Sequence, residues 1–292
     1  MGTKAISPGG ALRTPIERAQ VESDPSAIRR VPGWDRNEPV VSLELASLSA
    51  LHLERLIHGE TAAIRIANFY RDAALPGVVE RILASPLLAR YANAPDIGKI
   101  GNSYFETVCG LRKDDYFASA RSLKHELDEL FRPLTNPADL MKNVLAGTWE
   151  PGASVLQNDA GQTFFYGLIR LFDGTEALAH VDHLEWDDVS AARPIFQLAL
   201  NTYLRIPADG GELVVWDTVP TREEHDLIAK DYGVDEAYLR PFRSVAVKPN
   251  EGDLIMFDAQ RVHAVRTAHG PRITSSMFAV LLDAAGAFRV YS

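Results

Sequence analysis

A histidine and an aspartate lie two positions apart in the segment Leu178-Ala179-His180-Val181-Asp182. The apolar residues around them predict a β-strand, and residues i and i+2 of a strand face the same side. His180 and Asp182 are therefore expected to point at one spot. An imidazole and a carboxylate are two of the three protein ligands in a two-histidine, one-carboxylate metal site, which leaves three metal positions open for a chelating co-substrate and dioxygen.

His263 is predicted to supply the second imidazole, because it begins a strand that follows the apolar run Leu254 to Phe257. Arg272 comes nine residues later, and Thr274 follows two residues further on the same predicted strand. A guanidinium there can bind the distal carboxylate of 2-oxoglutarate in a charge-assisted contact, with Thr274 donating a further hydrogen bond. The residues together predict an enzyme that uses Fe(II), 2-oxoglutarate as co-substrate and O2.

Plainer interpretations of these residues compete with the metal site. A His-x-Asp pair by itself is more often solvated or turn-capping than bound to a metal. A rival register uses His183 and Glu185, completed by either His269 or His263. It is less favoured because the apolar strand ends before these residues. The histidines that fall on predicted helices or in an insertion, and are expected at surface positions, are His52, His58 and His225.

Aromatic and polar side chains on or near the predicted strands are the candidates for contacts with a small-molecule substrate. Each of them is individually more typical of core packing, as aromatic residues on strands usually are. The six candidates are Tyr104, Phe105, Tyr166, Asn201, Tyr203 and Trp216.

The composition is that of a globular protein, with 292 residues of which 46% are hydrophobic and 24% charged. A formal net charge of −9 without a Lys/Arg-rich run argues against a nucleic-acid partner. No apolar stretch approaches the roughly 20 residues that span a bilayer, and residues 1–10 do not read as a secretory signal. The single Cys109 permits no disulfide within the chain, so the cytoplasm is the expected compartment. The expected partner is a small molecule, and the oligomeric state is left open.

The elements that position these residues begin after an N-terminal segment. Residues 1–38 are rich in Pro, Gly, Ser and Arg, lack periodicity and are expected to form an extended arm. Residues 39–292 are expected to form one domain. The periodicities before residue 143 predict helices over 43–58, 75–88 and 116–131 and a strand over 62–69.

After residue 143 the sequence changes to short segments rich in Val, Ile, Phe, Tyr and Trp. The predicted strands are 163–172, 177–182, 196–205, 211–216, 244–248, 253–258, 262–267 and 274–283. Eight such strands in one block predict a mainly β fold with flanking helices and a double-stranded β-helix core of the jelly-roll or cupin-like type. Helices 43–58 and 116–131 are expected to cover one sheet. The charged interruption 218–241, helical around 221–229, is expected to be a lid-like insertion.

Several segments of the chain are similar to segments of one known group of enzymes. They are Ile64–Tyr70, Asp115–Ser119, Leu168–Phe172, Ala179–Asp182 and Pro207–Trp216. They resemble the carrier-independent Fe(II)/2-oxoglutarate oxygenases, and among these the aliphatic halogenases that chlorinate free hapalindole-type alkaloids. The likeness extends from about residue 60 to about residue 282.

The sequence departs from that group at Asp182, where the halogenases have a small residue that frees a coordination position for chloride. With a carboxylate in this place, the resemblance implies a hydroxylase or a related oxidase. Hydroxylation of an unactivated C–H bond is the expected outcome, while desaturation, epoxidation and ring closure would use the same triad. The expected substrate is a free small molecule, and amino acids, nucleosides or nucleotides and secondary metabolites all remain open.

Two other functions fit part of the sequence. One is a cupin-type metal enzyme that does not use 2-oxoglutarate, against which Arg272 argues. The other is a metal-free β-sandwich binding module, in which His180, Asp182 and His263 are merely surface polar residues.

Overall fold

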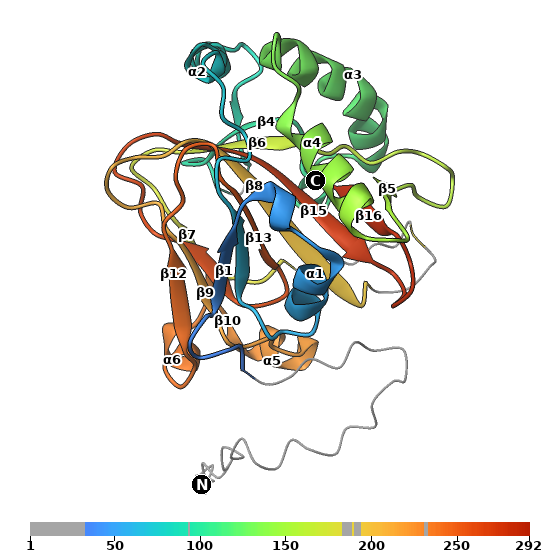
Figure 1. The fold of residues 1–292 in the computed structure, drawn as a ribbon. Coiled ribbons are helices and arrows are strands. Elements are labelled where there is room, and N and C mark those ends of the chain that lie inside the picture. Colours follow the sequence, from blue (N-terminus) through green and yellow to red (C-terminus); the bar gives the residue numbers. More distant parts are fainter. Residues whose placement is uncertain (1–32, 93, 183–188, 190–193, 231–232) are drawn as a thin grey trace, which may run out of the picture.

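The computed structural model describes residues 33–292 except 93, 183–188, 190–193 and 231–232. Figure 1 shows two β-sheets that make up the body of the molecule, with helices against the larger sheet. This is the predicted mainly β fold with flanking helices, and the eight strands expected after residue 143 are all present. Most are shorter than predicted, because the flanking residues continue into turns without joining a ladder.

The larger sheet has ten strands within the described residues. Its order is β1 (Val40–Leu43), β2 (Ala63–Ile66), β13 (Leu254–Asp258), β8 (Phe196–Arg205), β15 (Arg272–Leu281), β6 (Leu168–Phe172), β4 (Gly98–Ile100) and β3 (Ala89–Arg90), with β16 (Phe288–Tyr291) beside β15 and β5 (Ala153–Val155) beside β16. The central strands β13, β8, β15 and β6 pair antiparallel. They form one wall of the double-stranded β-helix.

The smaller sheet forms the opposite wall and has four strands in the described part of the chain. Its order is β12 (Ser244–Val247), β9 (Leu213–Trp216), β14 (His263–Val265) and β7 (Ala177–His180). β7 and β14 pair antiparallel with His180 directly opposite His263. The sheet therefore brings together two residues that are distant in the sequence.

Helices α1 (Ala50–Ile57) and α4 (Pro137–Thr148) cover the outer face of the larger sheet (Figure 1). Their apolar faces, including Leu53 and Leu145, share one core with the outward side chains of β8, β13 and β15. Asn136 caps α4 by accepting a hydrogen bond from the Ala138 amide, and Pro137 occupies the first turn, where its missing N–H costs nothing.

The prediction that helices 43–58 and 116–131 cover one sheet is therefore half right. The first region begins at the last residue of β1 and contains a short 3-10 turn (Leu45–Ser47) and then α1, which does cover the sheet. The second is α3 (Lys113–Phe131), which packs against α2 (Leu75–Leu83) and the 3-10 turn Tyr104–Val108 at one end of the barrel. Its place on the sheet is taken by α4, which was not predicted.

The insertion after β9 contains α5 (Arg222–Ile228), β10 (Ala229–Lys230), β11 (Gly233–Val234) and α6 (Glu236–Leu239). The predicted helix around 221–229 is thus confirmed. β11 lies against β7. The two are so close that a Cβ on Gly233 would stand only 3.2 Å from the Ala179 carbonyl oxygen and the Leu178 Cβ. The insertion is therefore packed directly on the strand that carries His180.

The N-terminal segment is described from Gly33 onward, and residues 1–32 of the predicted arm lie outside the described residues. Trp34 is buried, with 4% of its surface exposed. Its ring faces the guanidiniums of Arg261 and Arg243, at 5.1 and 6.0 Å from the ring centre. Cation–π contacts of this kind hold the segment on the domain.

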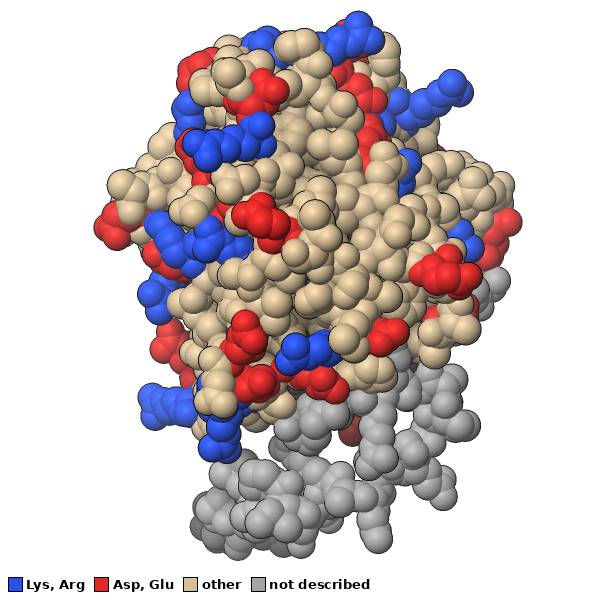
Figure 2. Space-filling model, in the orientation of Figure 1, with Lys and Arg blue, Asp and Glu red and all other residues tan. Residues whose placement is uncertain are grey.

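The surface in Figure 2 carries acidic and basic side chains interspersed over the face of the larger sheet and its helices. No helix among the described residues has the length and apolarity needed to cross a membrane.

Candidate active site

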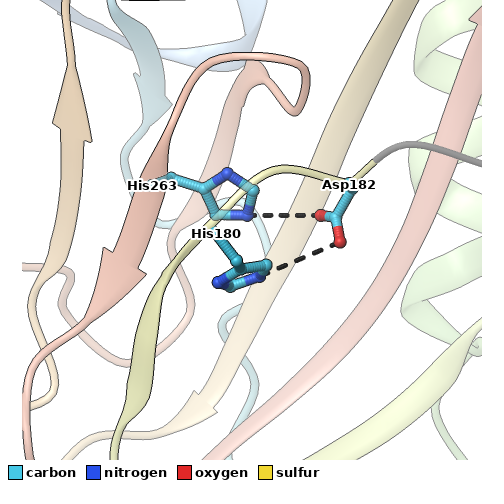
Figure 3. Close-up of side chains that lie close together, drawn as sticks. All are labelled: His180, Asp182 and His263. Carbon is cyan, nitrogen blue, oxygen red and sulfur yellow. Dashed lines mark ion pairs between the residues drawn. The ribbon is translucent and has the colours of Figure 1, made fainter. Parts of the chain in front are cut away.

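Two histidines and one aspartate converge between the two sheets (Figure 3). His180 ends β7, Asp182 follows two residues later, and His263 begins β14. One possible ligand atom from each lies within 4.8 Å of the others. The Asp182 carboxylate lies 3.2 Å from His263 Nε2 and 3.8 Å from His180 Nε2. The structure thus brings together the three residues that the sequence predicted to meet.

Both imidazoles are held by backbone carbonyls through Nδ1. His180 Nδ1 lies 2.6 Å from the Leu178 oxygen, and His263 Nδ1 lies 2.9 Å from the Arg261 oxygen. A carbonyl oxygen only accepts, so Nδ1 carries the hydrogen and Nε2 is the nitrogen left for a metal. This arrangement orients both rings toward the same spot.

The ionisation of His180 and Asp182 suits a divalent cation. Burial, followed by the charge of His263, lowers the pKa of His180 to about 4, so its imidazole is neutral at neutral pH. Burial by itself would raise the pKa of Asp182, but its close contact with His263, with smaller effects from His180 and Arg170, brings the pKa well below its usual range. A neutral imidazole and an ionised carboxylate are donors of the kind that non-haem Fe(II) sites use.

The turn between β13 and β14 positions two of the three ligands. The Ala259 carbonyl accepts a hydrogen bond from the Asp182 amide at 3.0 Å, and the Arg261 carbonyl accepts one from His263 Nδ1. The spacing of Asp182 from His263 therefore depends on the conformation of residues 259–262.

Arg261 fixes this turn from the side away from the metal ligands. Its side chain is buried, its Nη1 lies 2.6 Å from Asp217 Oδ1, and its Nη2 donates to the Gly59 carbonyl at 3.3 Å. Asp217 also contacts Arg243 at 3.3 Å, and Trp34 stacks against Arg261. Sequence analysis did not single out these residues, because their contacts join distant parts of the chain.

A cavity of about 300 Å³ opens beside the three ligands, and Arg272 lies in its wall. The guanidinium is buried between the rings of Phe172 and Tyr203, 5.1 and 5.0 Å from their centres. Its Nε donates to the Gly211 carbonyl at 3.2 Å, and its Nη2 lies 3.4 Å from the Tyr203 hydroxyl. Burial lowers its pKa from the usual value.

Among the described residues, no carboxylate forms an ion pair with Arg272. A buried guanidinium is costly unless an anion compensates it. Thr274, two residues further on β15, lines the same cavity. Arg272 and Thr274 thus lie in the wall of one cavity, and their contact with the distal carboxylate of 2-oxoglutarate stays a prediction.

Two of the six candidate substrate contacts, Phe105 and Asn201, line the cavity. Tyr203 lies behind Arg272 and supports it without reaching the cavity wall. Tyr104 is fully buried, because its ring packs against Tyr116, 5.4 Å away, in the aromatic core. These positions follow from strand and helix packing, which composition alone does not reveal.

The last two candidates, Tyr166 and Trp216, also lie outside the cavity wall. Tyr166 donates its hydroxyl hydrogen to Asp139 at 2.6 Å on the α4 side of the sheet. Trp216 packs against the insertion with Val234 and Leu239. The rival residues His183 and Glu185 fall outside the described residues.

The cavity also has wall residues that the sequence analysis did not assign to it. Arg170 of β6 and Tyr91 line it, and Arg170 Nε donates to the Tyr91 hydroxyl at 3.3 Å. A charged residue in the middle of the apolar strand Leu168–Phe172 was the available signal. His225 of the insertion also reaches the wall, although its helix suggested a surface position.

A double-stranded β-helix with this triad and a buried arginine on β15 defines a non-haem Fe(II)/2-oxoglutarate-dependent oxygenase. The model of the family "carrier-protein-independent halogenase WelO5" matches residues 41–288. The chain belongs to this family.

Individual relatives agree with that class. L-gamma-glutamyl-L-propargylglycine hydroxylase of Streptantibioticus cattleyicolor is 22% identical over 244 residues, 77% of this chain and 85% of the relative. L-isoleucine 3(1)-dioxygenase of Pantoea ananatis is 29% identical over 107 residues, 35% of this chain and 36% of the relative. The crystal structure of an N-substituted L-amino acid dioxygenase from Burkholderia ambifaria AMMD shares the fold, with a TM-score of 0.57, 17% identity and coverage of 83% and 91% of the two chains.

Proposed function

We propose that this chain hydroxylates an unactivated C–H bond of a free small molecule, using Fe(II), 2-oxoglutarate and O2. The observation that carries the proposal is the position of Asp182, whose carboxylate lies within 4 Å of the Nε2 atoms of both His180 and His263. A hydroxylase of this class requires that third protein ligand.

His180, Asp182 and His263 would hold the iron, and Arg272 with Thr274 would hold the distal carboxylate of 2-oxoglutarate. When bound, iron and 2-oxoglutarate supply the activation of O2 that oxidises the substrate. The protein keeps both imidazoles oriented through their Nδ1 hydrogen bonds and keeps Asp182 ionised. Its further task is to place one substrate carbon beside the metal.

The family name raises chlorination as the second candidate. His180, Asp182 and His263 would together hold the iron, and the Asp182 carboxylate would take the position that a chloride ligand needs. Halogenation needs that position to be open. The carboxylate therefore favours hydroxylation over the activity after which the family is named.

The substrate class proposed first is that of amino acids and their derivatives, because both curated relatives and the structurally similar dioxygenase are named for such compounds. A cavity of about 300 Å³ suits a compound of that size. The cytoplasm is the proposed compartment, because its reducing conditions maintain ferrous iron.

Residues 218–241 are proposed as the cover of the site. His225, Gly233 and Val234 of this insertion line the cavity together with His180. A cover at this position would exclude water and close over the substrate.

The test is anaerobic reconstitution with Fe(II) and 2-oxoglutarate, followed by O2, a panel of amino acids and chloride. We expect a visible absorption band that needs both iron and 2-oxoglutarate, and a product heavier than its substrate by one oxygen atom. A chlorinated product from the wild-type protein would overturn the hydroxylase assignment. Absence of the absorption band would overturn the use of 2-oxoglutarate.

A further inference from the structure

Asn201 is a polar side chain of the cavity wall that makes no hydrogen bond within the described part of the chain. It lies in the middle of the central strand β8, and 9% of its surface is exposed. Buried side-chain amides in proteins are almost always hydrogen-bonded, because an unpaired one is costly. A ligand that fills the cavity must therefore present a hydrogen-bonding group to Asn201, or the carboxamide stays unpaired.

The neighbouring side chains of β8 place Asn201 between the metal ligands and Arg272. Residues i and i+2 of a strand face the same side, so Gln197, Asn201 and Tyr203 share the inner face of β8. Gln197 Nε2 donates to the Asp182 carbonyl at 3.0 Å, and the Tyr203 hydroxyl lies 3.4 Å from Arg272 Nη2. Along the strand, Asn201 therefore lies between the residue that contacts a metal ligand and the residue that contacts the arginine.

Asn201 also belongs to a group of polar side chains that crosses from β8 to β15. Ser276 lies directly opposite it in the antiparallel register, and the Ser276 hydroxyl donates to Thr274 Oγ1 at 3.1 Å. This hydrogen bond leaves the Thr274 hydroxyl hydrogen for another acceptor. Asn201, Ser276, Thr274 and Arg272 all line the cavity. Such a group of donors suits a carboxylate, which accepts several hydrogen bonds at once.

We propose that Asn201 binds the co-substrate, with its Nδ2 donating a hydrogen bond to a carboxylate oxygen of 2-oxoglutarate. This inference rests on the proposed function, which places the distal carboxylate of 2-oxoglutarate at Arg272 and its other end at the metal ligands. A molecule that joins these two places passes Asn201. Asn201 then holds the co-substrate and not the substrate, for which the sequence had made it a candidate.

The test measures the dissociation constant of 2-oxoglutarate by anaerobic absorption titration of the Fe(II)-loaded protein. Asn201→Leu keeps most of the side-chain volume and removes the donor, so the dissociation constant should rise about tenfold or more. Asn201→Asp keeps the shape of the side chain and adds a charge of the same sign as the ligand, so the dissociation constant should rise further. The Asp variant also serves if the Leu variant does not fold.

The matched control is Thr202→Val. Thr202 is the next residue on β8, is fully buried outside the cavity wall, and has a hydroxyl without a hydrogen-bond partner among the described residues. Its replacement should leave the dissociation constant of 2-oxoglutarate within about twofold of the wild-type value. Denaturant unfolding of the metal-free protein should show Asn201→Leu to be at least as stable as the wild type, because no protein group loses a partner.

Two outcomes would overturn the inference and leave the proposed function intact: wild-type affinity for 2-oxoglutarate in both Asn201 variants, or an equal loss of affinity in Thr202→Val. Wild-type affinity together with a raised KM for the oxidised substrate would assign Asn201 to the substrate. Absence of the iron- and 2-oxoglutarate-dependent absorption in the wild type would instead overturn the proposed function itself.

Discussion

Single residues carry most of the chemistry, and the two histidines are the most direct to test. His180→Ala should abolish tight Fe(II) binding, because two remaining protein ligands hold a labile ferrous ion poorly. His183→Ala is the matched control and should leave the iron content nearly unchanged. Anaerobic titration followed by metal analysis measures both. The reverse pattern would support the rival register at His183 and Glu185.

Arg272 is predicted to anchor the co-substrate. Replacement by Leu removes the charge that a distal carboxylate would meet, and truncating such a pair costs about 2 to 5 kcal/mol. The KM for 2-oxoglutarate should rise by at least about tenfold, with iron affinity little changed. Steady-state kinetics at varied 2-oxoglutarate concentrations measure the effect. An unchanged KM would place the anchor elsewhere in the cavity wall, on Arg170.

Asp182 is predicted to decide between hydroxylation and halogenation. Asp182→Gly removes one ligand and its negative charge, which opens a position that an anion can enter. We expect loss of hydroxylation, chloride-dependent changes in the absorption of the iron complex, and trace chlorination at most, because the substrate carbon is not placed for chloride. Full hydroxylation by this variant would show that Asp182 is not a ligand.

At the scale of elements, the turn between β13 and β14 is predicted to set the geometry of the metal site. Arg261→Gln breaks a buried pair with Asp217, which typically costs about 3 to 5 kcal/mol, and should weaken iron binding about tenfold through the altered turn. Arg243→Gln removes the more exposed partner of Asp217 and should cost less than about 1 kcal/mol.

Denaturant unfolding of the metal-free protein and anaerobic iron titration separate the two effects of Arg261→Gln. Iron affinity that stays normal in the folded variant would show that the turn keeps its conformation without this pair. A similar loss of iron affinity in Arg243→Gln would show that the loss in Arg261→Gln comes from the exposed charges around Asp217 and not from the turn.

The insertion after β9 is predicted to couple 2-oxoglutarate turnover to substrate oxidation. Replacing residues 219–240 with a short Gly/Ser linker removes His225, Gly233 and Val234 from the cavity wall and admits water. The ratio of succinate to oxidised substrate should rise well above one. If this ratio stays near one while the melting temperature falls, the insertion has only a structural role.

Over the whole molecule, sequence patterns were informative where side chains repeat locally and uninformative where contacts are long-range. Alternation and turn residues located the eight strands, and the two-residue spacing of His180 and Asp182 correctly placed both beside His263. The cover by α4 was missed, although its buried residues Ala138, Met141 and Leu145 recur every three to four positions after the capping residue Asn136. Arg170 was not assigned to the cavity because its contact with Tyr91 depends on the pairing of β6 with β4 and β15.

The buried Trp34 has a practical consequence for work with this protein. The match to the family begins at residue 41, so a chain shortened to that boundary would retain every predicted ligand and every central strand. It would lose the ring that stacks on Arg261, whose carbonyl orients His263. Such a truncated protein is expected to purify with less iron than the full chain. A sequence chosen for expression should therefore begin before Trp34.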